Sequence, residues 1–272
     1  MLLFGTKKII IGLAGASSSM TSAYESMKAI VVIPTYNERE NLKKLADSIR
    51  RQNLPLDILF VDDNSPDGTG RLAEELAAAD PRIKALHRPK KQGLGRAYLD
   101  GFRWVLENGY DVILQMDADL SHDPNTLPDF LEKIEDHDAV FGSRYYKGVR
   151  VYNWSFKRLL LSKLSNEFIR LMLRIESTDT TTAFKCFRKE VLESIRWRKL
   201  RGRQNAFLID LVYKVIKSGF KTTEIPFVFK ERETGESKMQ FRVALESLLM
   251  VSRLMFANKR QLRRNRKKLS QA

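Results

Sequence analysis

Two patterns of apolar and polar residues alternate along the first half of the chain. Mostly apolar segments that predict strands occur at four places: residues 29–33, 56–61, 83–86 and 112–116. The first is a continuous apolar run, as expected of a strand covered on both faces. Apolar side chains at helical spacing, with charged residues opposite, occupy the segments between them: residues 40–51, 69–79 and 93–107. Successive strand–helix–strand units predict an α/β fold, with a mostly parallel central sheet flanked by helices.

The alternation weakens after about residue 147. Residues 157–174 predict a helix, and residues 219–230 have the composition of strands. The single cysteine, Cys186, lies in an apolar strand-like run, so we interpret it as a core residue; one cysteine also excludes an intrachain disulfide. An apolar helix is expected at residues 241–256, followed by a strongly basic tail.

The pattern divides the chain into three parts. No apolar run reaches the roughly 18 to 20 residues that a spanning helix requires. Near the start, Lys7 and Lys8 precede a short apolar run that superficially resembles a signal peptide. Because that run is short and the first clear element begins near Met27, we expect a flexible leader instead. The parts are a leader at 1–27, an α/β domain at 28–240 and a helix with a basic tail at 241–272.

The three most polar turns follow the strands that end near Ile33, Val61 and Met116. In a mostly parallel sheet these turns lie at the carboxyl ends of strands. Ligands bind outside those ends in open α/β sheets. The sequence therefore predicts a functional site at this edge of the sheet.

Asp117 and Asp119 form the sharpest chemical signal in the chain. On an extended backbone, side chains two residues apart point the same way, so both carboxylates can face one site. Charges this close repel each other unless a cation lies between them. Mg²⁺ or Mn²⁺ held by one or two carboxylates and by substrate phosphates fits this arrangement. The alternative is an acidic turn facing water, but the position after a buried strand favours the metal site.

Two further polar segments are candidates for binding. Asp63 ends the second strand, where an acidic residue can accept hydrogen bonds from a ribose or a base; a turn or helix cap is the alternative. No glycine-rich dinucleotide-binding motif follows the first strand, which argues against a Rossmann-type site for a dinucleotide cofactor. Residues 232–238 combine two cations with a glycine and a hydroxyl, so this loop either closes over a diphosphate or is a solvated turn.

These segments together resemble the dolichol-phosphate mannosyltransferases, also called polyprenol monophosphomannose synthases, of the family 2 glycosyltransferases. The resemblance extends over about residues 28–239 in consistent order. Asp-X-Asp alone is shared by many glycosyltransferases, so the specificity comes from five motifs jointly: residues 34–41 (PTYNEREN), 61–69 (VDDNSPDGT), 116–122 (MDADLSH), 142–145 (GSRY) and 232–238 (RETGESK).

The resemblance implies a GT-A nucleotide-diphospho-sugar transferase fold and an inverting, metal-dependent transfer of mannose from GDP-mannose to a polyprenyl or dolichyl monophosphate. Under this resemblance Asp117 and Asp119 hold Mg²⁺ or Mn²⁺ against the donor diphosphate, with the Ala118 backbone nearby. Donor or acceptor phosphates are bound by Arg144, Arg232 and Lys238, and the catalytic residues are Asp119, Arg144 and Arg232. The residues that contact the nucleoside are Pro34, Tyr36, Glu38, Val61 and Asp63.

The formal net charge of +15 favours anionic partners. Residues 259–268 carry seven cations, so the rest of the chain retains 15 − 7 = +8. We expect the helix at 241–256 and this tail to dock on an anionic membrane; a core-packing helix with a disordered tail is the alternative. The enzyme is then cytoplasmic and peripherally membrane-associated, with a membrane-embedded partner protein left open.

Two other functions are weighed against this one. A donor other than GDP-mannose, such as UDP-glucose, is compatible with the same fold and with most of the motifs. A basic nucleic-acid- or membrane-binding module is the non-enzyme alternative, but much of the charge lies in one tail and no RNA- or DNA-binding motif is found. We therefore expect no nucleic-acid partner.

Overall fold

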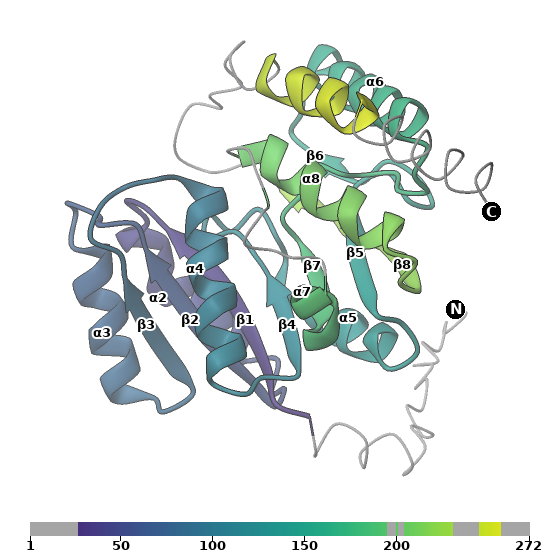
Figure 1. Cartoon of the computed structure of the whole chain (residues 1–272). Coiled ribbons are helices and arrows are strands. Elements are labelled where there is room, and N and C mark those ends of the chain that lie inside the picture. The colour runs from purple at the N-terminus through teal and green to yellow at the C-terminus, as the bar shows by residue number, and fades with distance from the viewer. Residues whose placement is uncertain (1–26, 195–199, 201–203, 231–244, 257–272) are drawn as a thin grey trace, which may run out of the picture.

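The computed structural model describes residues 27–194, 200, 204–230 and 245–256. Its centre is a seven-stranded sheet in the order β3-β2-β1-β4-β7-β5-β8 (Figure 1). The strands of this sheet are β1 (Ala29–Thr35), β2 (Leu56–Asp62), β3 (Ile83–His87), β4 (Val112–Gln115), β5 (Ala139–Ser143), β7 (Lys185–Arg188) and β8 (Thr222–Pro226). A second, two-stranded parallel sheet consists of β6 (Val151–Tyr152) and β9 (Phe229–Lys230).

The central sheet is parallel apart from one strand. The pairs β1–β2, β2–β3, β1–β4 and β5–β8 are parallel, whereas β7 runs antiparallel to both β4 and β5. The expected α/β fold with a mostly parallel sheet is therefore confirmed. The four strands expected in the first half are all present, and Cys186 lies buried in β7 as expected of a core residue.

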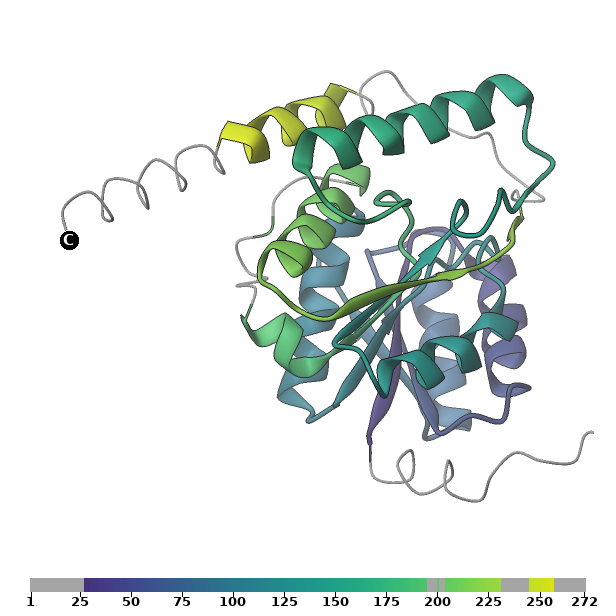
Figure 2. The same cartoon turned by 90° about the vertical axis from the view of Figure 1, so that its right-hand side faces the viewer.

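Helices cover both faces of the sheet, as Figures 1 and 2 show. Alternate residues of β1 fall into separate apolar clusters: Ile30 and Val32 pack in one, and Val31 and Ile33 in the other. This alternation explains why the strand reads as a continuous apolar run. The helices are α2 (Arg39–Arg50), α3 (Thr69–Ala79), α4 (Leu94–Glu107), α5 (Leu127–Ile134), α6 (Phe156–Leu173), α7 (Lys189–Ser194) and α8 (Gln204–Lys217), with a 3₁₀ turn at Pro124–Thr126 and a further helix at residues 245–256.

The late helices lie close to their expected positions. α6 is displaced by one residue from the expected 157–174. The helix at residues 245–256 corresponds to the expected 241–256, of which 241–244 lie outside the described residues. Its buried side chains, Met250, Val251 and Leu254, join the same apolar cluster as α4 and α8. No helix in the described ranges has the length and apolar character needed to cross a membrane.

Gly101 permits α4 to pack closely on β1 and β2. A Cβ at this position would lie 2.6 Å from Val32 Cγ1 and 3.2 Å from Val61 Cγ2. We expect Gly101→Ala to lower the free energy of unfolding by about 1–3 kcal/mol, because the added methyl overpacks the core. Helix propensity alone predicts the opposite, an increase of about 1 kcal/mol in the free energy of unfolding. Urea unfolding distinguishes overpacking from helix propensity, and a variant more stable than wild type would contradict the close packing.

Candidate functional site

The carboxyl ends of β1, β2 and β4 lie side by side. Asp63 donates its backbone N–H to the Thr35 carbonyl at 3.0 Å, and Met116 donates its own to the Val32 carbonyl at 3.2 Å. The loops that follow contain residues with positive φ: Asn37 (58°), Asn64 (59°) and Leu120 (61°). Asparagine tolerates this conformation, but leucine rarely adopts it. Backbone strain of this kind accumulates at functional sites, and here it lies one residue after Asp119.

The nucleoside candidates after β1 and β2 differ in accessibility. The side chains of Pro34 and Val61 are buried, and Val61 packs in the core, so only the backbone there is available to a ligand. Tyr36 and Glu38 are partly exposed. Lys91 Nζ lies 3.4 Å from the centroid of the Tyr36 ring, and the Glu38 N–H donates to Thr69 Oγ1 at 3.0 Å. Their contact with a nucleoside stays a prediction.

Asp63 is already engaged in internal contacts. Its carboxylate forms an ion pair with Arg88 and accepts the backbone N–H groups of Gln92 (3.0 Å) and Gly93 (2.8 Å). Arg88 also donates from Nε to Asp100 at 2.8 Å, and both members of the Arg88–Asp63 pair are buried. Asp63 thus holds the turn before α4 in place, and the structure adds this role to the nucleoside contact expected from the sequence.

Asp117 and Asp119 follow β4, which ends at Gln115, and a bend begins at Ala118. The chain turns through Leu120, whose φ is 61°. Both carboxylates act on one buried group. Burial raises the pKa of the Tyr98 hydroxyl well above its usual range, and the charges of both aspartates raise it further.

The site fits a divalent cation held jointly with a ligand. Asp119 is 8% exposed and its carboxylate accepts the Ser121 N–H at 3.1 Å, while the Asp117 side chain is 28% exposed. Ala118 is buried in the apolar cluster. Within the described residues there is no cluster of three or more His, Cys, Asp or Glu side chains that could enclose a metal. Two carboxylates that leave positions for phosphate oxygens match the preference of Mg²⁺ and Mn²⁺.

Arg144 follows β5 and forms a buried, bidentate ion pair. Its Nε donates to Asp179 Oδ2 at 2.7 Å and its Nη2 to Asp179 Oδ1 at 2.8 Å. Nη2 also donates to Thr181 Oγ1 at 2.8 Å. Burial opposes the charge on both partners, but their attraction outweighs it: the pKa of Arg144 is raised and that of Asp179 is lowered. The guanidinium is therefore fixed, with Nη1 as the nitrogen not committed to Asp179.

Comparison with known proteins identifies the family. A family model described as Glycosyl transferase family 2 matches residues 30–196. The chain belongs to this family. The transferase is also 42% identical over 240 residues to the polyprenol monophosphomannose synthase of Mycolicibacterium smegmatis, covering 88% of this chain and 91% of that one.

Solved structures share the fold of the transferase at low sequence identity. Glucosyl-3-phosphoglycerate synthase from Mycobacterium tuberculosis, with Mn²⁺ and UDP, superposes with a TM-score of 0.61 at 15% identity over 86% of this chain and 81% of that one. A mannosyltransferase from Pyrobaculum calidifontis, with GDP-Man and Mn²⁺, gives a TM-score of 0.56 at 18% identity over 86% and 64%. The GT-A fold and the glycosyltransferase activity expected from the motifs are confirmed.

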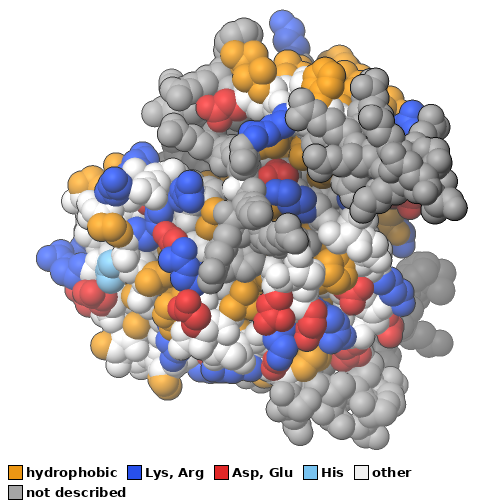
Figure 3. All heavy atoms as spheres, in the orientation of Figure 1, with side chains coloured by type: hydrophobic (Ala, Val, Ile, Leu, Met, Phe, Trp, Pro, Cys, Tyr) orange, Lys and Arg blue, Asp and Glu red, His pale blue; other side chains and the backbone are white. Residues whose placement is uncertain are grey.

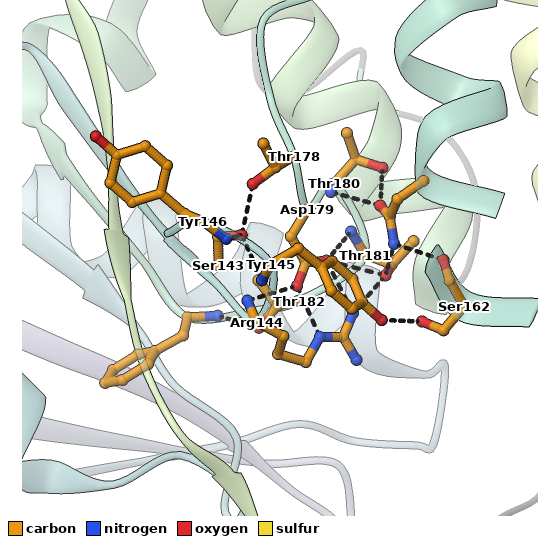
Figure 4. A network of polar contacts seen from close by, with 12 residues as sticks. Ser143, Arg144, Tyr145, Tyr146, Ser162, Thr178, Asp179, Thr180, Thr181 and Thr182 are labelled. Carbon is orange, nitrogen blue, oxygen red and sulfur yellow. Dashed lines mark hydrogen bonds and ion pairs between the residues drawn. The ribbon is translucent and has the colours of Figure 1, made fainter. Parts of the chain in front are cut away.

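The loop at residues 177–182 was not predicted from the sequence as part of the site. Its hydroxyl and carboxylate groups tie three elements of the transferase together (Figure 4). Thr178 Oγ1 lies 2.6 Å from Ser143 Oγ and donates to Glu224 Oε2 of β8 at 2.6 Å. The Thr180 N–H donates to Asn166 Oδ1 of α6 at 2.9 Å. A run of three threonines after an aspartate, directly before a buried strand, was the signal in the sequence.

Lys185 is a second buried cation behind this loop. Its ammonium donates to the Thr182 carbonyl. Burial lowers its pKa to about 8, although the charge of Asp179 partly offsets that effect. Asp179 thus neutralises Arg144 directly and Lys185 at longer range, which makes it the electrostatic centre of the loop.

The remaining candidates are placed as follows. Arg232, Lys238 and the loop that carries them lie outside the described residues, as does the basic tail. The charge of Asp117 contributes to the raised pKa of Arg144.

His122 connects the aspartate loop to the threonine loop, a role that the sequence analysis did not assign. Its Nδ1 accepts the Asp117 N–H at 3.1 Å, so the ring proton belongs on Nε2, 3.2 Å from Thr182 Oγ1. The ring stacks on Phe184 with centroids 4.8 Å apart. Burial lowers the pKa of His122 to about 3. The neutral imidazole thus orients the backbone beside Asp117.

The buried His122 predicts acid sensitivity. Between pH 6.5 and about 3 the unfolded chain binds a proton on His122 that the folded chain does not, so stability falls as the pH drops through this window. We expect this to contribute about 1 kcal/mol per pH unit. Urea unfolding at several pH values should give a shallower slope for His122→Asn than for wild type. His137→Gln, at a partly exposed ring, is the control; equal slopes in all three proteins would contradict the assignment.

Proposed function

We propose that this glycosyltransferase transfers mannose from GDP-mannose to a polyprenyl or dolichyl monophosphate, with inversion at the anomeric carbon. The observation that carries the proposal is the position of Asp117, Asp119 and the Arg144–Asp179 pair at the edge of the sheet where β4 and β5 end, with His122 joining the Asp117 N–H to Thr182. Such an arrangement suits a substrate pair with a diphosphate on one side and a phosphate on the other. The 42% identity to a polyprenol monophosphomannose synthase supports the sugar and the acceptor class.

The reaction is a single displacement. An oxygen of the acceptor phosphate forms a bond to C1 of the mannose while the bond from C1 to the diphosphate oxygen breaks, and GDP departs with that electron pair. The acceptor phosphate is already anionic near neutral pH, so the attack requires no general base. Asp117 and Asp119 would hold a divalent cation, which would neutralise charge on the departing diphosphate.

The chain's own residues position these groups. Asp179 holds the Arg144 guanidinium in one orientation, which lowers the entropy lost when Arg144 binds a phosphate. His122 fixes the backbone at Asp117. Arg232 and Lys238 are proposed to add cationic contacts to donor or acceptor phosphates. Pro34, Tyr36, Glu38, Val61 and Asp63 are proposed to surround the nucleoside, in part through backbone groups.

The donor is tested by competition. The purified protein is incubated with Mn²⁺, a polyprenyl phosphate and equal concentrations of GDP-mannose and UDP-glucose, and the lipid product is analysed by mass spectrometry and NMR. We expect mannose rather than glucose in the product, with the β configuration that inversion of an α-linked donor gives. A glucosylated lipid would preserve the mechanism but exclude the mannose assignment.

The acceptor class places the enzyme at a membrane. A polyprenyl phosphate resides in a bilayer, so the protein has to act as a peripheral enzyme at the membrane surface. We therefore retain the cytoplasmic, peripheral localisation as part of the proposal, with the helix at residues 241–256 and the basic tail as docking elements.

A further inference from the structure

Tyr98 places a hydroxyl group in the apolar layer between α4 and the sheet. The residue is fully buried, and its ring stacks against Phe102 of the same helix and Phe207 of α8, with centroids 5.9 and 6.1 Å apart. The outer side of α4 is charged (Figures 1 and 3), with Arg96 and Arg103 exposed. Packing on the inner side requires an aromatic ring but no hydroxyl, and a buried hydroxyl costs stability unless it is hydrogen-bonded.

The hydroxyl binds the chain where β4 passes into the two aspartates. It donates to the Met116 carbonyl at 3.2 Å. Burial, the charges of Asp117 and Asp119 and a hydrogen bond to the Asp117 side chain all raise the pKa of Tyr98 well above its usual range. The carbonyl and the carboxylate are both acceptors, so one hydroxyl contacts two consecutive residues. Tyr98 thus restrains the backbone and the carboxylate at the same place.

The neighbouring polar side chain on this face provides no such restraint. Gln115 is the last residue of β4, and side chains two residues apart share a face of a strand, so it lies on the same side as Ile113, which packs in the apolar cluster of Tyr98. Gln115 is fully buried, and neither polar atom of its amide has a hydrogen-bond partner among the described residues. On this face the orientation of Asp117 therefore depends on the Tyr98 hydroxyl rather than on Gln115.

Asp117 is held from both faces of the sheet. His122 accepts the Asp117 N–H at 3.1 Å, and its ring stacks on Phe184. Phe184 belongs to one apolar cluster of the sheet and Tyr98 to the other. One contact therefore fixes the backbone of Asp117 and the other its carboxylate. A carboxylate with a fixed direction loses less freedom when it binds a cation, and hydrogen-bond partners behind a metal ligand tune metal affinity.

A second buried tyrosine makes a similar contact away from the site. Tyr110 is 1% exposed and donates its hydroxyl to Asp57 Oδ2 at 2.7 Å. Asp57 is the second residue of β2, at the amino-terminal end of the parallel strands, whereas Asp117 follows the carboxyl end of β4. Both hydroxyls bind a carboxylate from the apolar layer, but only Tyr98 of these two tyrosines does so beside the site.

We infer that Tyr98 is a positioning residue for sugar transfer: its hydroxyl holds the Asp117 carboxylate in the direction that a divalent cation and the donor diphosphate require. This rests on the proposed function, which places the cation at Asp117 and Asp119, and extends it to a helix that none of the sequence motifs includes. Because Tyr98 is fully buried, it acts through Asp117 and not by contact with a substrate.

Calorimetry with GDP, in Mn²⁺ and in EDTA, tests this role. In Tyr98→Phe the affinity for GDP in Mn²⁺ should fall roughly 10- to 100-fold, whereas the affinity in EDTA should stay within about twofold of wild type. The matched control, Tyr110→Phe, should bind GDP like wild type in both conditions. Each variant keeps its ring and loses one buried hydrogen bond, so both should fold, with similarly lowered midpoints of urea unfolding.

Two results would overturn the positioning role. One is an affinity for GDP in Mn²⁺ that is unchanged in Tyr98→Phe. The other is an equal loss in Tyr110→Phe, or an equal loss by Tyr98→Phe in EDTA, which a general loss of structure would produce.

A parallel assay of mannose transfer to a polyprenyl phosphate separates this role from the proposed function. If wild type binds GDP in a Mn²⁺-dependent manner but transfers no mannose, the proposed function is contradicted, and a selective loss of that binding in Tyr98→Phe still supports the positioning role. No Mn²⁺-dependent binding of GDP by wild type would contradict both.

Discussion

Replacing Asp119 with asparagine should lower kcat/KM for sugar transfer on the order of a thousandfold, about 4 kcal/mol of transition-state stabilisation. The substitution preserves the size of the side chain and removes its charge. Without that charge the site holds a divalent cation poorly, so the departing diphosphate is left insufficiently neutralised. Transfer is measured at saturating Mn²⁺ and donor. Binding of Mn²⁺ with GDP, measured by calorimetry, should weaken in parallel.

Asp123→Asn is the matched control for this prediction. Asp123 lies four residues further along the same connection, where its carboxylate accepts the Asn125 N–H at 3.0 Å and caps the short 3₁₀ turn. Asparagine is an equally good cap, so this variant should stay within a few-fold of wild type. If Asp119→Asn retains more than about a tenth of wild-type activity, the metal site is wrongly placed.

Replacing Asp179 with alanine should lower the free energy of unfolding by about 3–5 kcal/mol, because it leaves Arg144 and Lys185 as buried charges without their shared anion. The side chains of Asp179 and Arg144 are 0% and 8% exposed, so solvent cannot compensate. Thr181 also loses a partner, since its N–H and hydroxyl contact Asp179 Oδ1 at 3.3 and 3.2 Å. Urea unfolding at neutral pH measures the change.

An exposed pair provides the comparison. Asp47 pairs with Lys43 on the surface of α2, with 50% and 66% of the two side chains exposed. Asp47→Ala should therefore change stability by less than about 1 kcal/mol. The double variant R144M/D179L should recover much of the stability lost in Asp179→Ala while remaining inactive, which separates the structural role of the pair from its role in binding phosphate. A loss below about 1 kcal/mol in Asp179→Ala would contradict the electrostatic account.

The first half of the fold could be predicted because β1, β2 and β4 are buried on both faces. These strands are mostly apolar in sequence, and the polar turns that follow them lie at one edge as the parallel order requires. The second half of the fold follows these patterns less closely. β7 runs antiparallel and begins with a buried lysine, Lys185. α6 is apolar on both faces, so its periodicity predicted a helix but not which face packs against the sheet.

The site was predicted only where the chemistry lies within a short motif. Asp117 and Asp119 are two residues apart and stand out in the sequence. The Arg144–Asp179 and His122–Thr182 contacts join residues 35 and 60 positions apart, and nothing local relates them.

The most direct measurement is transfer of labelled mannose from GDP-mannose to a polyprenyl phosphate by the purified, full-length protein in the presence of Mn²⁺. The account predicts label in the lipid fraction, a lipid mass increased by one hexose, GDP released in equal amount, and loss of all three on chelation of the metal. No transfer of mannose to the lipid, with GDP-mannose binding intact, would contradict it.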